Sequence, residues 1–232
     1  MKWSIRLTSS ALFIFVILFL TSTASAGLIA SWTFETTPPA DVNNSASYPN
    51  AIPANSGSGN ASGVHASGAT DWTTPAGNGS ANSFNSNNWS IGDYYQFQVS
   101  TLGMENLAFS WDQTRSATGP ASFSLQYSTD GTSFTNFFAY TVPQVNWLST
   151  GSPNPSSHFT QDFSAISALD NDSSVFFRLT ATSAPSNVAL GASRIDNISI
   201  SAVPEPSTFL LGLVGMSVFG ARQLRRQISV PQ

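Results

Sequence analysis

Apolar side chains recur at every second position in several stretches of the chain, and this pattern limits the folds it can adopt more than any other feature. The stretches lie at residues 28–34, 95–99, 107–111, 123–127 and 175–181. Successive side chains of a strand point to opposite faces, so each stretch predicts a strand with one apolar and one polar face. No part of the body sustains the helical period of about 3.6 residues. We therefore expect an all-β, antiparallel β-sandwich of roughly eight strands over residues 27–202.

Residues 36–90 differ from the rest of the body, because they are dense in Asn, Ser, Gly and Pro and hold few aliphatic side chains. Loops of this length are uncommon inside compact domains. Trp72 and Trp89 interrupt the polar tract, and indoles are seldom left wholly in water. We expect ordered loops, with a short strand or two, wrapped over the sandwich.

The N-terminal end has the three parts of a secretory signal peptide. Lys2 and Arg6 supply a charged region, residues 11–20 are uninterruptedly apolar, and Ala24 and Ala26 frame an A-x-A cleavage site. We predict a signal peptide over residues 1–26, export by the Sec translocon and removal by signal peptidase. The alternative is an uncleaved N-terminal anchor.

The C-terminal end carries a second apolar segment. Residues 209–221 hold no charge, and an arginine cluster follows at once, formed by Arg222, Arg225 and Arg226. We predict a single transmembrane helix over about residues 207–221, short for a bilayer core of about 30 Å. The arginines would stop transfer and stay cytoplasmic with residues 228–232, which places the body outside.

This apolar segment is preceded by Pro204, Glu205 and Pro206. The order of Pro-Glu-Pro, apolar helix and basic end over residues 203–227 resembles the PEP-CTERM sorting signal of exported Gram-negative bacterial proteins. The resemblance implies that an exosortase-type enzyme recognises these three residues, removes the helix from an inner-membrane intermediate, and leaves the protein at the outer surface or in the extracellular matrix. The alternative is a plain membrane anchor that is never processed.

Four motifs of the body also resemble a family. They are Trp32-Thr33-Phe34-Glu35, Gly92-Asp93-Tyr94-Tyr95-Gln96-Phe97, Leu125-Gln126-Tyr127-Ser128-Thr129-Asp130-Gly131 and Arg194-Ile195-Asp196-Asn197-Ile198. Together they are similar to the jelly-roll ectodomains carried by many PEP-CTERM proteins, and the resemblance implies a jelly-roll-like sandwich.

The charge of the body excludes several classes of partner. Between the two terminal segments the chain has no lysine and three arginines, Arg115, Arg178 and Arg194, against a clear excess of acidic residues. Binding nucleic acid requires clustered basic side chains, so we exclude that partner. Anionic polysaccharide would be repelled unless a cation bridged it, whereas a neutral sugar or a divalent cation fits better. The absence of cysteine excludes disulfides, thiol catalysis and thiolate zinc sites.

Catalytic residues are not evident. His65 and His158 lie in loops and are expected at the solvated surface, and no Gly-x-Ser-x-Gly motif accompanies them. The acids that a glycosidase would need are present only as scattered turn or cap candidates, namely Asp93, Glu105, Asp112 and Asp162. We expect no enzyme activity and no cofactor other than a structural calcium. Asp170 and Asp172 are its candidate ligands, with a plain turn as the alternative.

Exposed indoles are the remaining candidates for ligand binding. Trp72, Trp89 and Trp147 lie in polar loops, where they could stack on a sugar ring or fill the space beneath a loop. Three functions remain open. The first is a non-catalytic surface or biofilm-matrix protein, the second a carbohydrate-binding module that tethers the cell to extracellular polysaccharide, and the third, disfavoured, a hydrolase.

Overall fold

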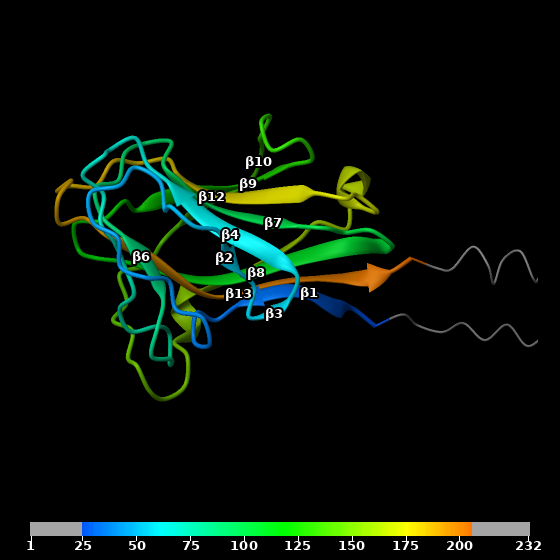
Figure 1. The fold of residues 1–232 in the computed structure, drawn as a ribbon, viewed down its shortest axis with the longest axis horizontal. Coiled ribbons are helices and arrows are strands. Elements are labelled where there is room, and N and C mark those ends of the chain that lie inside the picture. The colour runs from blue at the N-terminus through cyan, green and yellow to red at the C-terminus, as the bar shows by residue number, and fades with distance from the viewer. Residues whose placement is uncertain (1–24, 206–232) are drawn as a thin grey trace, which may run out of the picture.

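The computed structural model describes residues 25–205, which form two packed antiparallel sheets (Figure 1). The strands are β1 (Gly27–Trp32), β2 (Ile52–Pro53), β3 (Ser56–Gly57), β4 (Gly59–Val64), β5 (Trp72–Thr73), β6 (Phe84–Ser86), β7 (Tyr94–Val99), β8 (Met104–Arg115), β9 (Ser122–Ser128), β10 (Thr135–Thr141), β11 (His158–Asp162), β12 (Val175–Ala181) and β13 (Ser193–Pro204). Two short 3-10 turns, η1 (Pro155–Ser157) and η2 (Ser167–Leu169), complete the described elements.

The seven-stranded sheet has the order β11-β8-β13-β1-β3, with β6 paired to β13 and β5 to β6, and the six-stranded sheet has the order β10-β9-β12-β7-β4-β2. The all-β, antiparallel prediction is confirmed. More strands form than the roughly eight expected, because β2, β3, β5 and β6 are two or three residues long. Periodicity cannot detect strands of that length.

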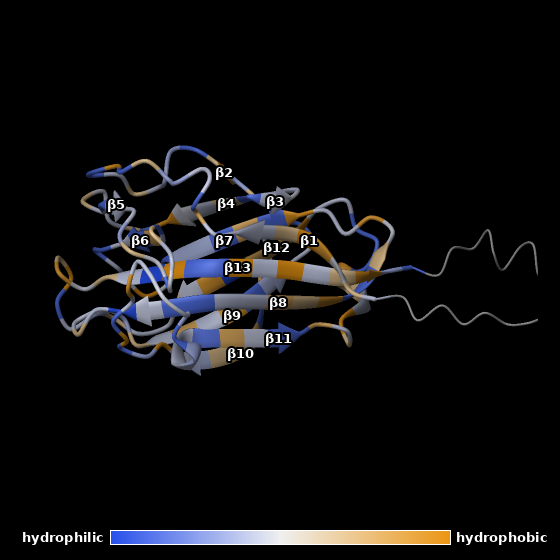
Figure 2. Cartoon of the chain, turned by 90° about the horizontal axis from the view of Figure 1, so that it is seen from below, coloured by the Kyte–Doolittle hydropathy of each residue, from blue (hydrophilic) through white to orange (hydrophobic). Residues whose placement is uncertain are grey.

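The alternation predicted from sequence is the alternation that builds the core. In β12, Val175, Phe177 and Leu179 are fully buried, whereas Arg178 points to the outer side of the six-stranded sheet. Figure 2 shows the same banding, with apolar and polar residues alternating along the long strands. The core is unusually aromatic, as at Trp32 and Phe97, whose ring centroids lie 5.2 Å apart between the sheets. Burial of apolar side chains is the dominant favourable contribution to folding, and aromatic rings bury more area per residue than aliphatic side chains.

Residues 36–90 are part of the folded body rather than loops alone. They contain β2 to β6, and β4 is a full partner of β7 within the six-stranded sheet. Gly63 of β4 is required by packing, because a Cβ at that position would lie 2.3 Å from the indole of Trp72. The prediction of one or two short strands was therefore wrong in number. The Gly and Ser residues of β4 give no strand pattern in the sequence, and pairing with a distant strand stabilises it.

A β-bulge interrupts β13, which with β8 is one of the two longest strands of the seven-stranded sheet. The pairing of β13 with β8 shifts between Asp196 and Ser199, and Asn197 adopts a positive φ of 50°. Ile195 points into the core before the bulge, and the next core-facing residue is Ile198. The spacing is three residues, whereas a regular strand would have two. The bulge thereby resets the alternation and leaves Asp196 on the outer face, beneath the loops that cover it.

Candidate functional site

The outer face of the six-stranded sheet collects amide and aromatic side chains from several strands. Arg178 of β12 pairs across the sheet with Gln96 of β7 and with Gln126 of β9. Its Nε donates a hydrogen bond of 2.8 Å to Gln96 Oε1, and Gln126 Nε2 donates one of 2.7 Å to Asn136 Oδ1. We call this surface, centred on Arg178, the amide face.

Two aromatic rings cover the two planes of the Arg178 guanidinium. Its Cζ lies 3.8 Å from the ring centroid of Tyr94 and 3.6 Å from that of Phe134, which precedes β10. Both distances place the group directly over a ring face, so the guanidinium is stacked between the two rings. Partial burial lowers the pKa of Arg178. An arginine still remains charged at any physiological pH.

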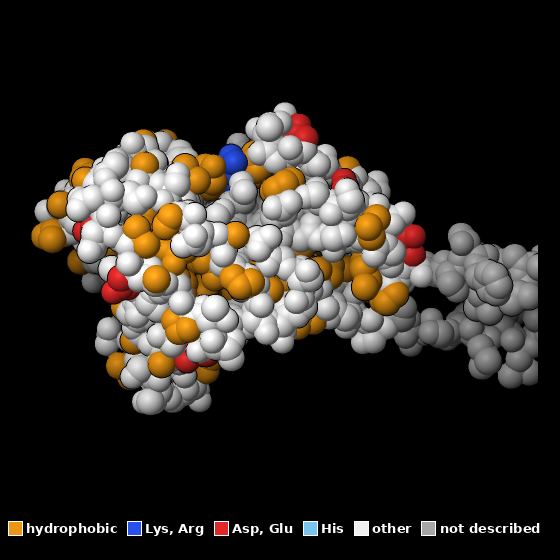
Figure 3. All heavy atoms as spheres, viewed as in Figure 1, with side chains coloured by type: hydrophobic (Ala, Val, Ile, Leu, Met, Phe, Trp, Pro, Cys, Tyr) orange, Lys and Arg blue, Asp and Glu red, His pale blue; other side chains and the backbone are white. Residues whose placement is uncertain are grey.

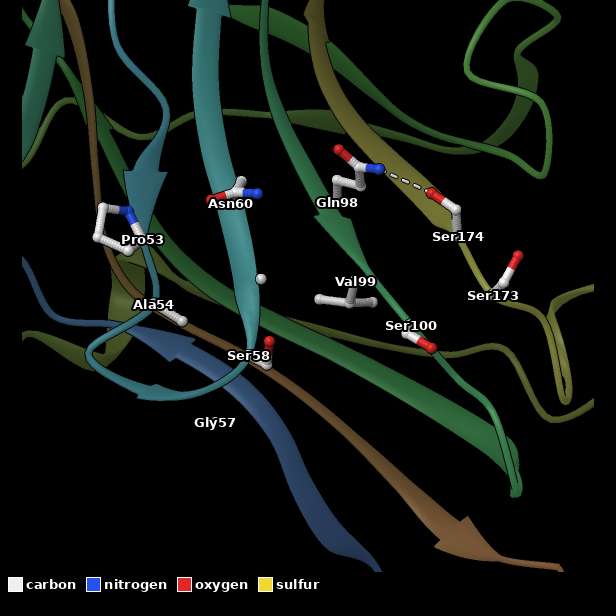
Figure 4. A pocket seen from close by; sticks show the side chains of 11 residues that line it. Pro53, Ala54, Gly57, Ser58, Asn60, Gln98, Val99, Ser100, Ser173 and Ser174 are labelled. Carbon is white, nitrogen blue, oxygen red and sulfur yellow. Dashed lines mark hydrogen bonds between the residues drawn. The ribbon is translucent and has the colours of Figure 1, made fainter.

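A polar pocket continues from the amide face toward the end of the molecule where both termini leave the fold. It has a volume of about 340 Å³ and is lined by residues 53–54, 57–60, 98–100 and 173–174. Figure 4 shows Gln98 and Asn60 pointing outward from β7 and β4, with Gln98 Nε2 donating a hydrogen bond of 2.7 Å to Ser174 Oγ. Most of the lining consists of hydroxyl groups, amides and glycine backbone, with apolar side chains from Pro53, Ala54 and Val99, which suits a hydroxyl-rich ligand better than an apolar one.

A second pocket, of about 350 Å³, lies between two loops that cover the seven-stranded sheet. These loops, residues 76–83 and 146–155, form the teal and yellow-green projection at the bottom of Figure 1. Three side chains, His158, Asp112 and Asp196, are aligned across that sheet, and the two carboxylates bind the loop at residues 76–83. Asp112 Oδ2 accepts from Asn78 Nδ2 at 2.8 Å, and Asp196 Oδ2 accepts from the Asn78 backbone N–H at 2.8 Å.

The two buried carboxylates share this cluster with the half-exposed His158, whose Nδ1 lies 2.7 Å from Asp112 Oδ1. Burial raises the pKa of Asp196 to about 7, and repulsion from Asp112 adds to the effect. Every carboxylate oxygen of the pair accepts bonds from the chain itself. The cluster therefore fastens the loops to the sheet.

His65 is buried, so the expectation of a solvated histidine is wrong for this residue. Its ring lies between Trp72 and Trp89, at centroid distances of 4.8 and 4.2 Å, and burial lowers its pKa to about 4. Nε2 lies 3.2 Å from Ser86 Oγ, and Nδ1 lies 3.5 Å from Asp93 Oδ2.

Serine, histidine and aspartate thus come together as in a hydrolase triad, but their setting is that of a core cluster. Ser86, His65 and Asp93 are all buried, and none of them lines either pocket. Ser86 Oγ is also 2.9 Å from the hydroxyl of Tyr95, which donates to the Ser193 carbonyl at 2.6 Å. This chain of hydrogen bonds satisfies polar groups between the sheets and presents no nucleophile to a substrate.

The three indoles considered for sugar binding are buried. Trp72, Trp89 and Trp147 are exposed by 0%, 1% and 3%, and each indole N–H donates to an acceptor of the chain. None offers a free face to a ligand in this structure. The alternative role therefore holds, in which the indoles fill the space beneath loops.

The calcium candidates accept backbone hydrogen bonds, Asp170 from a residue of β8 and Asp172 from its own turn. Asp170 Oδ1 accepts from the Asn106 backbone N–H at 3.1 Å, and Asp172 Oδ1 accepts from that of Ser174 at 2.9 Å. Residues 25–205 contain no group of three or more His, Asp or Glu side chains suited to a metal ion. A structural calcium at these two residues stays a prediction.

The predicted targeting segments fall mostly outside the described residues. Ala26 is exposed directly before β1, and Pro204 ends β13, but Ala24, Pro206, Arg222, Arg225 and Arg226 are not described, nor is the predicted helix 207–221. In the part of the chain that the structure covers, no helix has the length and apolarity needed to cross a bilayer.

Sequence reasoning missed Arg178 with Tyr94 and Phe134, and the cluster around His65. For Arg178 one signal was present, since it is the basic residue at an outward position of an apolar stripe. The aromatic rings on either side of it come from β7 and from the residue before β10. No local pattern connects those positions.

Comparison with solved structures finds remote likenesses. A CBM35 from Cellvibrio japonicus aligns at 16% identity and a TM-score of 0.36, over 56% of this chain and 82% of that one. A xylan-binding CBM22 domain aligns at 13% identity and a TM-score of 0.42, over 78% of this chain and 97% of that one. A cleaved adhesin domain of Lys-gingipain from Porphyromonas gingivalis aligns at 14% identity and a TM-score of 0.38, over 69% of this chain and 96% of that one. Likenesses this remote assign no ligand.

No curated protein matches the chain. The match that bears on function is at the C-terminal end, where residues 202–227 fit the model of the PEP-CTERM protein-sorting motif. The match begins within β13, whose last residue is Pro204. The chain therefore carries a PEP-CTERM protein-sorting motif joined directly to an antiparallel β-sandwich.

Proposed function

We propose that this chain is an exported, non-catalytic protein of the cell surface or exopolysaccharide matrix, sorted and processed through its C-terminal motif by an exosortase-type enzyme. The observation that carries the proposal is the PEP-CTERM match over residues 202–227. The signal peptide predicted over residues 1–26 supports export through the Sec translocon and signal peptidase.

The end of β13 brings the sorting motif close to the folded body. Pro204 pairs with Met104 of β8, and the Glu205 N–H donates a hydrogen bond of 2.9 Å to the Gly103 carbonyl. Pro204 is thus the last residue of β13, and Glu205, directly after it, is still hydrogen-bonded to the turn before β8. A processing enzyme must reach to the rim of the sandwich or unpair this end of β13, which costs little because terminal pairs fray.

A carbohydrate-binding role is the second candidate, and the amide face favours it. That surface offers amide donors and acceptors from neighbouring strands, beside the hydroxyl-lined pocket at Asn60, Gln98 and Ser174. Amide groups can both donate to and accept from sugar hydroxyls. On the side of the molecule seen in Figure 1, few side chains carry a charge (Figure 3). A hydrolase is disfavoured, because Ser86 and His65 are buried away from both pockets.

Intact mass measurement and cell fractionation test the proposal. We expect a mature species that begins at Gly27, ends near Pro204, and occurs at the outer surface or in the medium. Glu205→Gln should leave a longer species in the inner membrane, whereas Glu105→Gln, at the same end of the molecule, should be processed normally. A wild-type chain that keeps residues 207–226 in the inner membrane would show a plain anchor and refute sorting.

A further inference from the structure

Arg178 differs from the two other arginines of the body in what its side chain contacts. Arg115 donates from Nε and Nη1 to the backbone carbonyls of Val142, Ser116 and Ala117. Arg194 donates from Nη1 to the Ala76 carbonyl and lies over the indole of Trp147. These two side chains hold loops in place, because their guanidinium groups donate hydrogen bonds to backbone carbonyls of the protein itself.

The end of the Arg178 side chain has no such partner within residues 25–205. Nε is bonded to Gln96, but neither Nη has a hydrogen-bond acceptor, and no carboxylate pairs with the group. Tyr94 and Phe134 cover its two planes. The guanidinium is therefore held by Gln96 and by two rings, and its Nη donors have no acceptor among residues 25–205.

An open guanidinium edge is a fork of parallel N–H donors, whose geometry matches the two oxygens of a carboxylate. The stacking rings fix this fork before a ligand arrives, which lowers the entropy lost on binding. Around it lie Gln96, Gln98, Gln126 and Asn136, all amides of the same outer face. Amides both donate and accept, as hydroxyl groups do, so the surroundings favour a sugar as the bearer of the carboxylate.

We propose that the amide face binds an acidic polysaccharide, with the Arg178 fork holding the carboxylate of a uronic acid residue and the neighbouring amides holding its hydroxyl groups. This inference rests on the proposed role at the cell surface or in the matrix, and names the ligand class of that role. It revises the expectation from net charge that anionic polysaccharide is repelled. Charges separated by more than about 8 Å are largely screened at physiological salt. The nearby Arg178, rather than the net charge of the body, therefore determines whether an anionic group is attracted to this face.

Binding of the full chain in mild detergent to three oligosaccharides tests this inference. The probes are oligogalacturonate, its methyl ester, which lacks the charge, and a neutral cello-oligosaccharide, with inorganic phosphate and sulfate as competitors. We expect oligogalacturonate to bind about tenfold more tightly than its methyl ester, which corresponds to about 1.4 kcal/mol. Phosphate and sulfate should compete only weakly, because they lack the hydroxyl groups.

Two substitutions separate charge from geometry. Arg178→Met keeps an extended apolar side chain and removes the donors, and Arg178→Lys keeps the charge and removes the fork. Both should weaken oligogalacturonate binding about tenfold. Thr160→Ala, at an exposed position of the other sheet, should change nothing. Circular dichroism and a urea midpoint establish that each variant is folded.

Equal binding of the acidic and neutral probes, or unchanged oligogalacturonate binding in folded Arg178→Met, would overturn the inference. Full competition by phosphate or sulfate would also overturn it, because the site would then recognise any anion rather than a sugar acid. The proposed function is judged separately, since mass and fractionation report on sorting whatever the amide face binds.

Discussion

Protonation of His65 offers a quantitative test of how the aromatic core is held together. Burial lowers the pKa of this imidazole to about 4 from 6.5. The unfolded chain therefore takes up the proton more readily than the folded one. The contribution of the neutral His65 ring to the free energy of unfolding is complete above the unfolded pKa of 6.5, and it is lost as the pH falls toward the folded pKa of about 4. Between about pH 7 and about pH 4.5 the loss amounts to about 2 kcal/mol, because one pKa unit corresponds to about 1.4 kcal/mol.

Urea unfolding at the two pH values, followed by tryptophan fluorescence, measures this loss against His65→Gln, which cannot titrate. Groups such as Asp196 titrate in both proteins, so the difference between them isolates His65. Ser86→Ala is the matched control, because it breaks the same hydrogen-bond chain and leaves the imidazole in place. It should be less stable at both pH values and should keep the acid-dependent loss.

The reasoning is refuted if the wild type and His65→Gln lose the same free energy of unfolding on acidification. That result would mean that the imidazole is protonated as readily in the folded state as in the unfolded chain. The ring would then be open to water despite its position between Trp72 and Trp89.

Three further predictions follow from the packing. Asp196, whose pKa burial raises to about 7 from 3.8, should act in the opposite direction, so stability falls as the pH rises through that range. Asp196→Asn should remove roughly 4 kcal/mol of this pH dependence in urea unfolding at a series of pH values. Gly63→Ala should lower the unfolding free energy by about 1–3 kcal/mol, because its Cβ would meet the Trp72 indole. Tyr95→Phe should lower the unfolding free energy by about 1–3 kcal/mol, because the Ser193 carbonyl loses its donor. For Gly63→Ala or Tyr95→Phe, a change in unfolding free energy within about 0.5 kcal/mol would contradict the packing described.

The strands with regular alternation could be predicted from sequence, because the period of two depends only on local geometry. Phe109 and Phe177 were placed on apolar stripes, and both are fully buried in the core between the sheets. The strand β4 could not be predicted, since Gly59 to Val64 has no apolar stripe and is held by pairing with β7. Pairing with a distant strand leaves no periodic signal in the segment itself.

The candidate site was largely beyond local reasoning. Arg178 lies within the predicted strand 175–181, but its ring partners come from other parts of the chain. His65 was misjudged because a Gly- and Ser-rich neighbourhood suggests a surface loop, whereas Trp72 and Trp89 close over it. The contacts of Arg178 join residues far apart in sequence, whereas those of His65 join its loop to Trp72 nearby and to Trp89 further along the chain.

The all-β class and the sorting motif at residues 202–227 are both readable from the linear sequence. Each is a property of consecutive residues, either a strand period or a linear motif. The burial of the loop tryptophans, the neutral state of His65 in the core and the unused Nη donors of Arg178 among residues 25–205 are visible only in the folded structure. Burial, pKa and ligand geometry depend on which distant segments meet, and that is settled by the packing of the two sheets.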